Sequence, residues 1–154
     1  MTSEPGSTPQ NPIDNSTEWV GKHISAYVAT DGREGSSQRG APLLLLTTKG
    51  AKSGLWRRTA LIFGERDGNY LIVASMGGAE KHPSWYLNLL HNPEVYLQVY
   101  DRKTRAIART ATPTEKPPLW DEMVAIWPDY ANYQKKTERD IPVVVLEPVP
   151  VEEE

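Results

Sequence analysis

Short apolar runs separated by turn signals constrain the fold of this chain most strongly. The runs are too short for most helices and are bounded by glycine, proline or polar residues, which is typical of β-strands. They cover residues 43–48, 56–65, 70–75, 94–100, 104–111 and 141–146. Asp67-Gly68 is a strong β-hairpin signal, and residues 101–103 form the expected turn of a second hairpin. Since long helices do not alternate with these strands, we predict a mainly β (α+β) fold with an antiparallel barrel of about six strands.

Only a few helices are expected around the strands. Asn15 stands in a capping position, with Glu18 three residues later, before apolar side chains at helical spacing. We expect this N-terminal helix to pack on the barrel. The alternatives are a lid over a pocket and a face that rests on a membrane surface. A second helical stretch is predicted after Pro113, with an interruption at Pro128.

The composition along the chain predicts one domain between two tails. Residues 1–12 are polar and lack an apolar pattern, so we predict a disordered N-terminal tail. Residues 13–148 are predicted to form a single domain, which is long enough to bury a substantial core. Residues 149–154 are predicted to be an acidic, solvated tail.

Composition also excludes several classes of site. The chain contains no cysteine, which rules out disulfides, thiolate nucleophiles and cysteine-bound metals and favours the cytoplasm. His23, His82 and His91 lack metal-ligand spacing, so no metal is predicted. The net charge of -3 gives no general attraction to nucleic acid. No apolar run approaches the roughly 18 residues of a membrane span. A peripheral contact through the N-terminal helix would still associate the protein with a membrane.

The connection between the third and fourth strands, residues 76–93, is unusually elaborate. Gly77 and Gly78 allow a positive φ and a close approach of the backbone to another group. Pro83 can open a short aromatic helix, which Asn92-Pro93 would end. Connections of this kind often carry a ligand.

Three further groups of residues are candidates for binding or chemistry. Residues 49–54 form a glycine-containing basic turn, followed by Arg57 and Arg58, that is either an anion site or a solvated basic hairpin. The Ser75 hydroxyl can donate to a carbonyl or a ring nitrogen, without a recognisable Ser-His-Asp arrangement. Trp127, Tyr130 and Tyr133 share one helical face, which fits either a core seam or a pocket lid.

Four motifs together resemble the actinobacterial deazaflavin-dependent nitroreductase family, which includes quinone reductases and aflatoxin-reducing enzymes that use reduced coenzyme F420. The motifs are residues 50–54, Arg57-Arg58, residues 76–93 and residues 141–148. The similarity extends from about residue 19 to residue 148. The resemblance implies a split β-barrel, like that of FMN-binding pyridoxamine oxidases, with the deazaflavin lying in a groove.

The resemblance also implies roles for individual residues. It assigns cofactor binding to Lys52, Ser53, Arg57, Arg58, Ala74, Ser75, Met76, Gly77, Gly78, Trp85 and Tyr86. It assigns substrate binding to Ile62, Trp127, Tyr130 and Tyr133. Catalytic roles are expected for Ser75, Tyr130 and Tyr133, which would meet negative charge on the acceptor. Met76 stands where the family often has a basic residue, so part of the family's grip on the anionic tail is expected to be missing. Ile62 stands where a nitroreductase of the family has tyrosine, and Trp127 replaces another tyrosine, which argues against nitroimidazole reduction.

The predicted function is hydride transfer from reduced coenzyme F420 to a small electron-poor acceptor, such as a quinone, a conjugated enone or a nitroaromatic. The protein supplies orientation and water exclusion, while the cofactor carries the chemistry. Two alternatives are an FMN-dependent split-barrel reductase and a non-catalytic deazaflavin carrier. The protein is expected to be a monomer or a homodimer.

Overall fold

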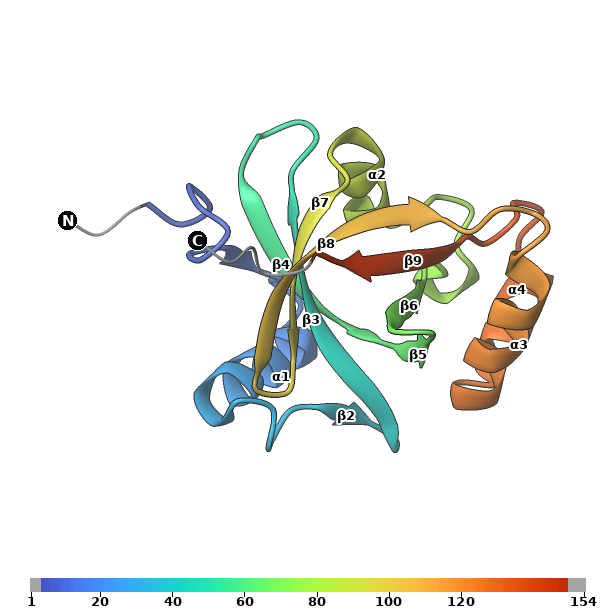
Figure 1. Cartoon of the computed structure of the whole chain (residues 1–154), viewed down its shortest axis with the longest axis horizontal. Coiled ribbons are helices and arrows are strands. Elements are labelled where there is room, and N and C mark those ends of the chain that lie inside the picture. Colours follow the sequence, from blue (N-terminus) through green and yellow to red (C-terminus); the bar gives the residue numbers. More distant parts are fainter. Residues whose placement is uncertain (1–3, 150–154) are drawn as a thin grey trace.

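One curled sheet forms the centre of the computed structural model, which describes residues 4–149 (Figure 1). Its strands are β1 (Ile13–Asp14), β2 (Ser37–Gln38), β3 (Ala41–Lys49), β4 (Trp56–Ile62), β5 (Gly64–Arg66), β6 (Asn69–Val73), β7 (Glu94–Val99), β8 (Arg102–Thr110) and β9 (Val143–Pro148). They lie in the order β1-β4-β3-β7-β8-β9-β6-β5, and β2 pairs with β3. All neighbours run antiparallel except the short parallel pair of β1 and β4.

The sheet wraps round as a split barrel because its far ends are consecutive in the chain. β4 and β5 lie near opposite ends of the strand order, yet only Phe63 separates them in the sequence. The six predicted strands are confirmed, although the predicted strand 56–65 breaks at Phe63. Asp67-Gly68 turns the predicted hairpin with both residues at positive φ. The second hairpin turns at Tyr100-Asp101, one residue earlier than expected.

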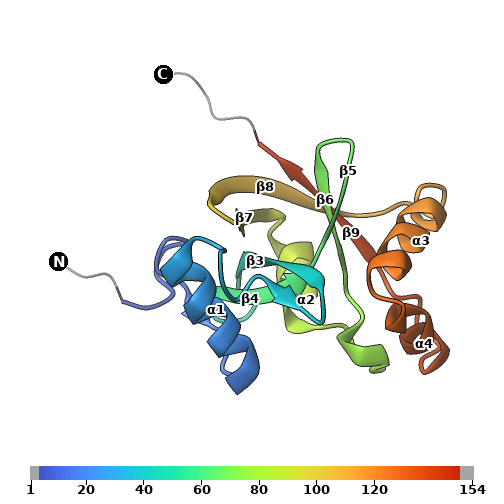
Figure 2. The same cartoon turned by 90° about the horizontal axis from the view of Figure 1, so that it is seen from below.

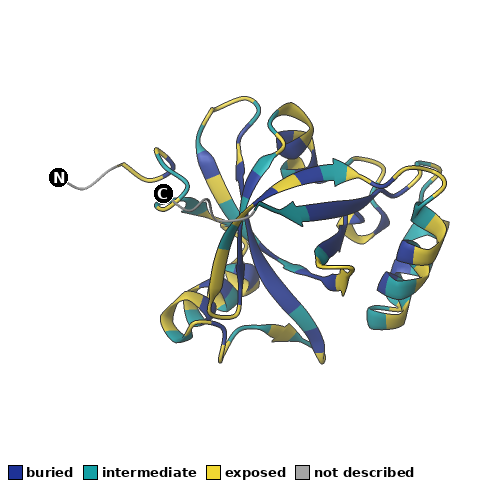
Figure 3. Ribbon diagram, viewed as in Figure 1, coloured by how far each residue is buried: buried dark blue, intermediate teal, exposed yellow. Residues whose placement is uncertain are grey.

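The apolar run in β3 serves two cores. Leu43 and Leu45 belong to one buried cluster, whereas Leu44 and Leu46 belong to another. Successive side chains of a strand point to opposite faces, so a strand covered on both sides needs a continuous apolar run. Figure 3 shows this burial along the central strands.

Four helices and one 3₁₀ turn pack around the described part of the barrel. They are α1 (Glu18–Thr30), the turn η1 (Met76–Gly78), α2 (Ser84–His91), α3 (Lys116–Ile126) and α4 (Asp129–Lys135). The predicted break at Pro128 is confirmed, since it separates α3 from α4. Figure 2 shows α1 at the left and α4 at the right of the molecule, with α2 between them. None of the described helices has the length and apolar character needed to span a membrane.

Helix α1 packs on the barrel as expected but begins differently. Its Tyr27 side chain is fully buried, and the Tyr27 hydroxyl accepts a hydrogen bond from the Tyr100 N–H at 2.6 Å. The predicted cap at Asn15 is wrong, because Thr17 occupies the N-cap position. The Asn15 amide instead donates to Thr59 Oγ1 at 3.1 Å, which ties the chain before α1 to β4.

Residues 4–12 correct the expectation of a disordered tail. The Gly6 N–H donates to the Asn11 carbonyl at 2.7 Å, and the Trp56 N–H donates to the Gly6 carbonyl at 2.8 Å. These hydrogen bonds hold the segment beside the start of β4. The Val149 N–H donates to the Arg105 carbonyl at 2.8 Å. Residues 1–3 and 150–154 of the two predicted tails lie outside the described residues.

Candidate functional site

Two adjoining hollows form one groove. The first, which we call the aromatic hollow, has a volume of about 410 Å³ and lies between α1, α2, α4 and strand β4. The second, the basic hollow, has a volume of about 330 Å³ and lies between residues 13–16, β4 and α2. They share four lining residues: Asn15, Thr59, Ser84 and Trp85. The shared wall places the two hollows side by side, within reach of the two ends of one elongated ligand.

The structure gathers most of the predicted site residues on this groove. The aromatic hollow is lined by Ile62, Ser75, Met76, Gly77, Trp85, Trp127, Tyr130 and Tyr133. The basic hollow is lined by Arg57, Arg58 and Trp85. The side chains of Ala74 and Tyr86 lie in the second core, where the Tyr86 hydroxyl is 2.7 Å from Thr110 Oγ1. The predicted contribution of these two side chains is therefore confined to supporting the groove from behind.

An aromatic wall closes one side of the aromatic hollow. The Trp127 Nε1–H donates to the Tyr133 hydroxyl at 3.3 Å, and the Tyr130 and Tyr133 rings meet edge to face with centroids 6.1 Å apart. Arg39 adds a cation–π contact, with its Cζ atom 5.7 Å from the Trp127 ring. The same three aromatic residues also pack on the first core. The sequence left a core seam and a pocket lid as alternatives for these three residues, and in the structure they both pack on the core and line the hollow.

Tyr130 presents an unusual phenol to this hollow. Its side chain is 5% exposed, and its hydroxyl has no hydrogen-bond partner among residues 4–149. Burial, helped by the neighbouring Tyr133, raises the pKa of Tyr130 well above its ordinary value. The phenol is therefore neutral at physiological pH and acts as a hydrogen-bond donor rather than a base.

The segment after β6 forms a concave backbone turn at the hollow. Ser75 is right-handed helical, with φ -80° and ψ -40°, and Met76, Gly77 and Gly78 follow at φ 46°, 64° and 84°. Successive right- and left-handed residues aim their N–H groups into a common concavity, called a nest, that suits an anion or a carbonyl oxygen. In the described structure, the N–H groups of Ser75, Met76 and Gly77 and the Ser75 hydroxyl donate to no protein acceptor.

The two arginines of the basic hollow differ in availability. Arg58 forms a bidentate ion pair with Asp14, in which its Nε donates to Oδ1 at 2.6 Å and its Nη2 donates to Oδ2 at 3.1 Å. Arg57 is exposed, and no carboxylate of the described chain lies within ion-pair distance of it. Arg57 is therefore the free cation of the pair, which sequence reasoning alone could not distinguish from Arg58.

The basic turn adjoins the hollow without lining it. Lys52 and Ser53 are exposed in the β3–β4 turn, and the Ser53 hydroxyl accepts the Leu55 N–H at 3.1 Å. The Ala51 N–H donates to Asn88 Oδ1 at 3.0 Å, and Asn88 lines the basic hollow. The turn therefore stands next to the hollow, where Lys52 extends the positive charge of Arg57.

Sequence reasoning missed several lining residues. Asn15 and Thr59 line both hollows, and Trp19 and Val20 of α1 line the aromatic hollow. Ser84 also lines both hollows. Ser84 stands directly after Pro83, at the start of the predicted helix, which is the only sequence signal that could have identified it. The other residues carry no signal that distinguishes them from ordinary cap or core residues.

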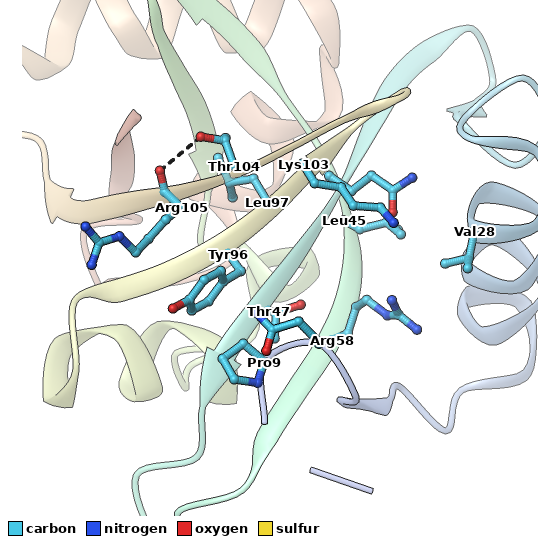
Figure 4. A pocket seen from close by; sticks show the side chains of 12 residues that line it. Pro9, Val28, Leu45, Thr47, Arg58, Tyr96, Leu97, Lys103, Thr104 and Arg105 are labelled. Carbon is cyan, nitrogen blue, oxygen red and sulfur yellow. Dashed lines mark hydrogen bonds between the residues drawn. The ribbon is translucent and has the colours of Figure 1, made fainter. Parts of the chain in front are cut away.

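A larger hollow of about 480 Å³ lies elsewhere, on β3, β7 and β8 (Figure 4). Its cations are Arg58, which is paired with Asp14, Arg105, which is paired with Glu94 at 3.1 Å, and Lys103. This hollow contains neither the glycine turn nor the aromatic wall. The groove therefore remains the stronger candidate site.

Comparison with known proteins identifies relatives along most of the chain. The family model described as F420H(2)-dependent quinone reductase matches residues 19–148. A protein of Mycobacterium tuberculosis that bears this same name is 40% identical over 134 residues, which cover 80% of this chain and 86% of the relative.

Solved structures agree with this match. A structure described as an F420-H2 dependent reductase, FDR-A, is 45% identical with a TM-score of 0.64, covering 69% of this chain and 94% of that chain. A structure described as a domain-swapped dimer is 41% identical with a TM-score of 0.67, covering 86% of this chain and 100% of that chain. The haem storage protein HutZ of Vibrio cholerae, at 17% identity and a TM-score of 0.53 over 71% of this chain and 82% of that chain, shares the fold alone.

Proposed function

The chain belongs to the F420H(2)-dependent quinone reductase family, and we propose that it transfers a hydride from reduced coenzyme F420 to a quinone held in the aromatic hollow. The observation that carries this proposal is the groove itself, in which unpartnered donors and aromatic rings adjoin a free cation. Membership of a reductase family favours coenzyme F420 over the two alternatives, an FMN-dependent reductase and a non-catalytic carrier.

The residues of the groove fit the two chemical parts of coenzyme F420. Its flat deazaflavin suits the aromatic hollow, where the Gly77 backbone and the Trp85 ring form part of the wall. Its phosphate and carboxylate tail suits Arg57 in the basic hollow and Lys52 beyond it. When bound, the reduced coenzyme supplies the hydride. Arg58 contributes less, because Asp14 already occupies its guanidinium.

Tyr130 and Ser75 are the proposed donors to the quinone. A quinone oxygen gains negative charge as the ring is reduced, and preorganised donors stabilise that charge. The neutral Tyr130 phenol and the Ser75 hydroxyl have no competing partner in the described structure. The proton that completes the hydroquinone comes from solvent. Trp127 and Tyr133 orient the acceptor and exclude water from it.

Carbonyl acceptors are expected to be reduced better than nitro compounds. A conjugated enone presents one carbonyl oxygen, which Tyr130 can meet in the same way. Ile62 lines the aromatic hollow with an alkyl side chain, so it supplies no donor for a nitro group. We therefore expect enones to rank between quinones and nitroaromatics.

Helix α1 is proposed to be a wall of the site. Trp19 and Val20 line the aromatic hollow, which supports this role over a membrane contact. A structure that is 41% identical to this chain is described as a domain-swapped dimer, so a homodimer is a candidate state beside the monomer. Light scattering of the purified protein distinguishes these two states.

Turnover with a quinone tests the proposal. Reduced coenzyme F420 is mixed with the protein and menadione, and the absorbance of the oxidised coenzyme is followed. We expect saturable oxidation that requires both the protein and the quinone. Absence of protein-dependent oxidation across quinones of different size would contradict the proposal. The same assay with an enone and a nitroaromatic measures the expected ranking.

A further inference from the structure

The Arg139 guanidinium donates hydrogen bonds to backbone carbonyls of residues 74–79, the segment that contains the nest. Its Nε donates to the Ala79 carbonyl at 2.8 Å, its Nη2 to the Ser75 carbonyl at 2.7 Å, and its Nη1 to the Ala74 carbonyl at 3.1 Å. Nη1 also lies 3.1 Å from His82 Nδ1. A guanidinium has five N–H donors, and four of them are engaged here by residues 74–82.

Arg139 is itself fixed to the helix that carries the aromatic wall. The Gln134 side chain donates to the Arg139 carbonyl at 2.8 Å and accepts the Ile141 N–H at 2.9 Å. Gln134 directly follows Tyr133 on α4. Gly78 is also close to this helix, since a Cβ built on Gly78 would lie 2.6 Å from the Tyr133 carbonyl oxygen. Arg139 and Gly78 thus connect the nest to the helix that carries the aromatic wall.

The contacts of Arg139 divide the polar groups of the segment. The carbonyls of Ala74, Ser75 and Ala79 are bound by the guanidinium, while the N–H groups of Ser75, Met76 and Gly77 have no acceptor in the described chain. The Ser75 carbonyl and the Met76 N–H belong to the same peptide group. A cation at the carbonyl polarises this group and strengthens its N–H as a donor.

Two further features are relevant to the role of Arg139: the strained backbone at Met76 and the unpaired charge of Arg139 itself. Met76 has φ 46°, in the left-handed region that is costly for a residue with a Cβ. No carboxylate of the described residues pairs with Arg139, whose N–H groups face three backbone carbonyls and the His82 ring. An uncompensated cation behind the nest favours negative charge in front of it.

We propose that Arg139 is a positioning residue that holds the amides of residues 75–77 as a preformed site for an electron-rich carbonyl oxygen of one of the two reactants. The proposal rests on the proposed function. The oxygen belongs either to the bound deazaflavin or to the quinone, and both present the same chemistry to the nest.

The test compares Arg139→Gln and Arg139→Lys with Arg66→Gln, a matched arginine change away from the groove, at a partly buried ion pair with Glu122. The first readouts use protein without cofactor. Amide exchange of Gly78 and Ala79, which donate to the Ser75 and Met76 carbonyls, should become about tenfold faster in Arg139→Gln because the charged anchor is lost. Burial first, and the Arg139 cation second, lower the pKa of His82, so this pKa should rise in Arg139→Gln, which removes the second cause. Arg139→Lys keeps the positive charge, so the pKa of His82 should stay close to its wild-type value. Lysine cannot reproduce the several directed hydrogen bonds of the guanidinium, so the amides of Gly78 and Ala79 should be less protected from exchange than in the wild type.

Two binding readouts then identify the oxygen. A weaker Kd for oxidised coenzyme F420 in Arg139→Gln assigns it to the deazaflavin. An unchanged Kd with a lower kcat/KM for menadione assigns it to the quinone. The positioning role is overturned if Arg139→Gln matches Arg66→Gln in exchange, His82 pKa, Kd and kcat/KM. If the wild-type protein bound no coenzyme F420, the proposed function would fail. The exchange and pKa measurements would still test the positioning role of Arg139.

Discussion

The two hollows of the groove present their polar groups in opposite ways. In the aromatic hollow, the donors are uncharged, largely buried and attached to a braced backbone, as with Ser75 and Tyr130. In the basic hollow, the donors are charged and lie on long side chains, and one of the two arginines is already paired. The difference indicates that the aromatic hollow sets orientation, whereas the basic hollow contributes attraction.

The largest expected effect tests how rigid the aromatic hollow is. Gly78→Ala would place a Cβ 2.6 Å from the Tyr133 carbonyl oxygen at a φ of 84°. We expect a loss of about 3 kcal/mol in the free energy of unfolding, from backbone strain and overpacking together. Urea denaturation measures it.

Gly77→Ala is the matched control for this prediction. Gly77 also has a positive φ, but a Cβ there would meet nothing within 4 Å. Strain alone should cost about 1 kcal/mol. Equal losses for the two variants would mean that the contact between Gly78 and α4 does not brace the segment.

The second prediction concerns the uncharged donors. Tyr130→Phe should lower kcat/KM for menadione about tenfold, because it removes one hydrogen bond to the developing charge. The Kd for the coenzyme should stay within about twofold. Steady-state kinetics and a fluorescence titration measure the two quantities.

Tyr133→Phe provides the comparison for Tyr130. The Tyr133 hydroxyl already accepts from Trp127, so its loss should disturb the wall with a smaller effect on kcat/KM. If neither substitution changed the kinetics of any acceptor, the aromatic wall would have no part in acceptor binding.

The third prediction separates the two arginines. Arg57→Gln should weaken coenzyme binding about fivefold and flatten its salt dependence, since an exposed ion pair contributes up to about 1 kcal/mol. Arg58→Gln should change binding less, because Asp14 already pairs with it. Titrations at two salt concentrations measure this. A larger effect at Arg58 would reverse the roles assigned to the two residues.

The smallest effect comes from pH. Burial first, and the Arg139 cation second, lower the pKa of His82 below the ordinary 6.5. At pH values well below the folded pKa, His82 is charged in both the folded and the unfolded protein. At pH values well above 6.5, His82 is neutral in both. His82 therefore contributes stability above about pH 6.5 that is lost as the pH falls through its lower folded pKa. His82→Gln should reduce this part of the pH dependence of unfolding. An unchanged pH profile would contradict the contribution of His82.

Local patterns predicted much of the fold. The Asp67-Gly68 hairpin, the break at Pro128 and the helix after Pro83 each depend on residues adjacent in sequence. The disordered tail and the Asn15 cap were wrong because hydrogen bonds to β4 override local preference there. The sequence and its resemblance also placed the glycine turn and the aromatic residues on one site.

Long-range pairing explains what the sequence could not predict. Arg139 lies 64 positions from Ser75, and Asp14 lies 44 positions from Arg58. No local pattern reveals which arginine is neutralised and which remains free. That difference decides which residues of the basic hollow can hold an anionic ligand.

The most direct test of the account is a fluorescence titration of the protein with oxidised coenzyme F420 and with FMN, at low and high salt. The account predicts selective binding of coenzyme F420 that weakens as salt screens Arg57 and Lys52. Tighter binding of FMN, or binding of coenzyme F420 that salt leaves unchanged, would contradict the assignment of the two hollows.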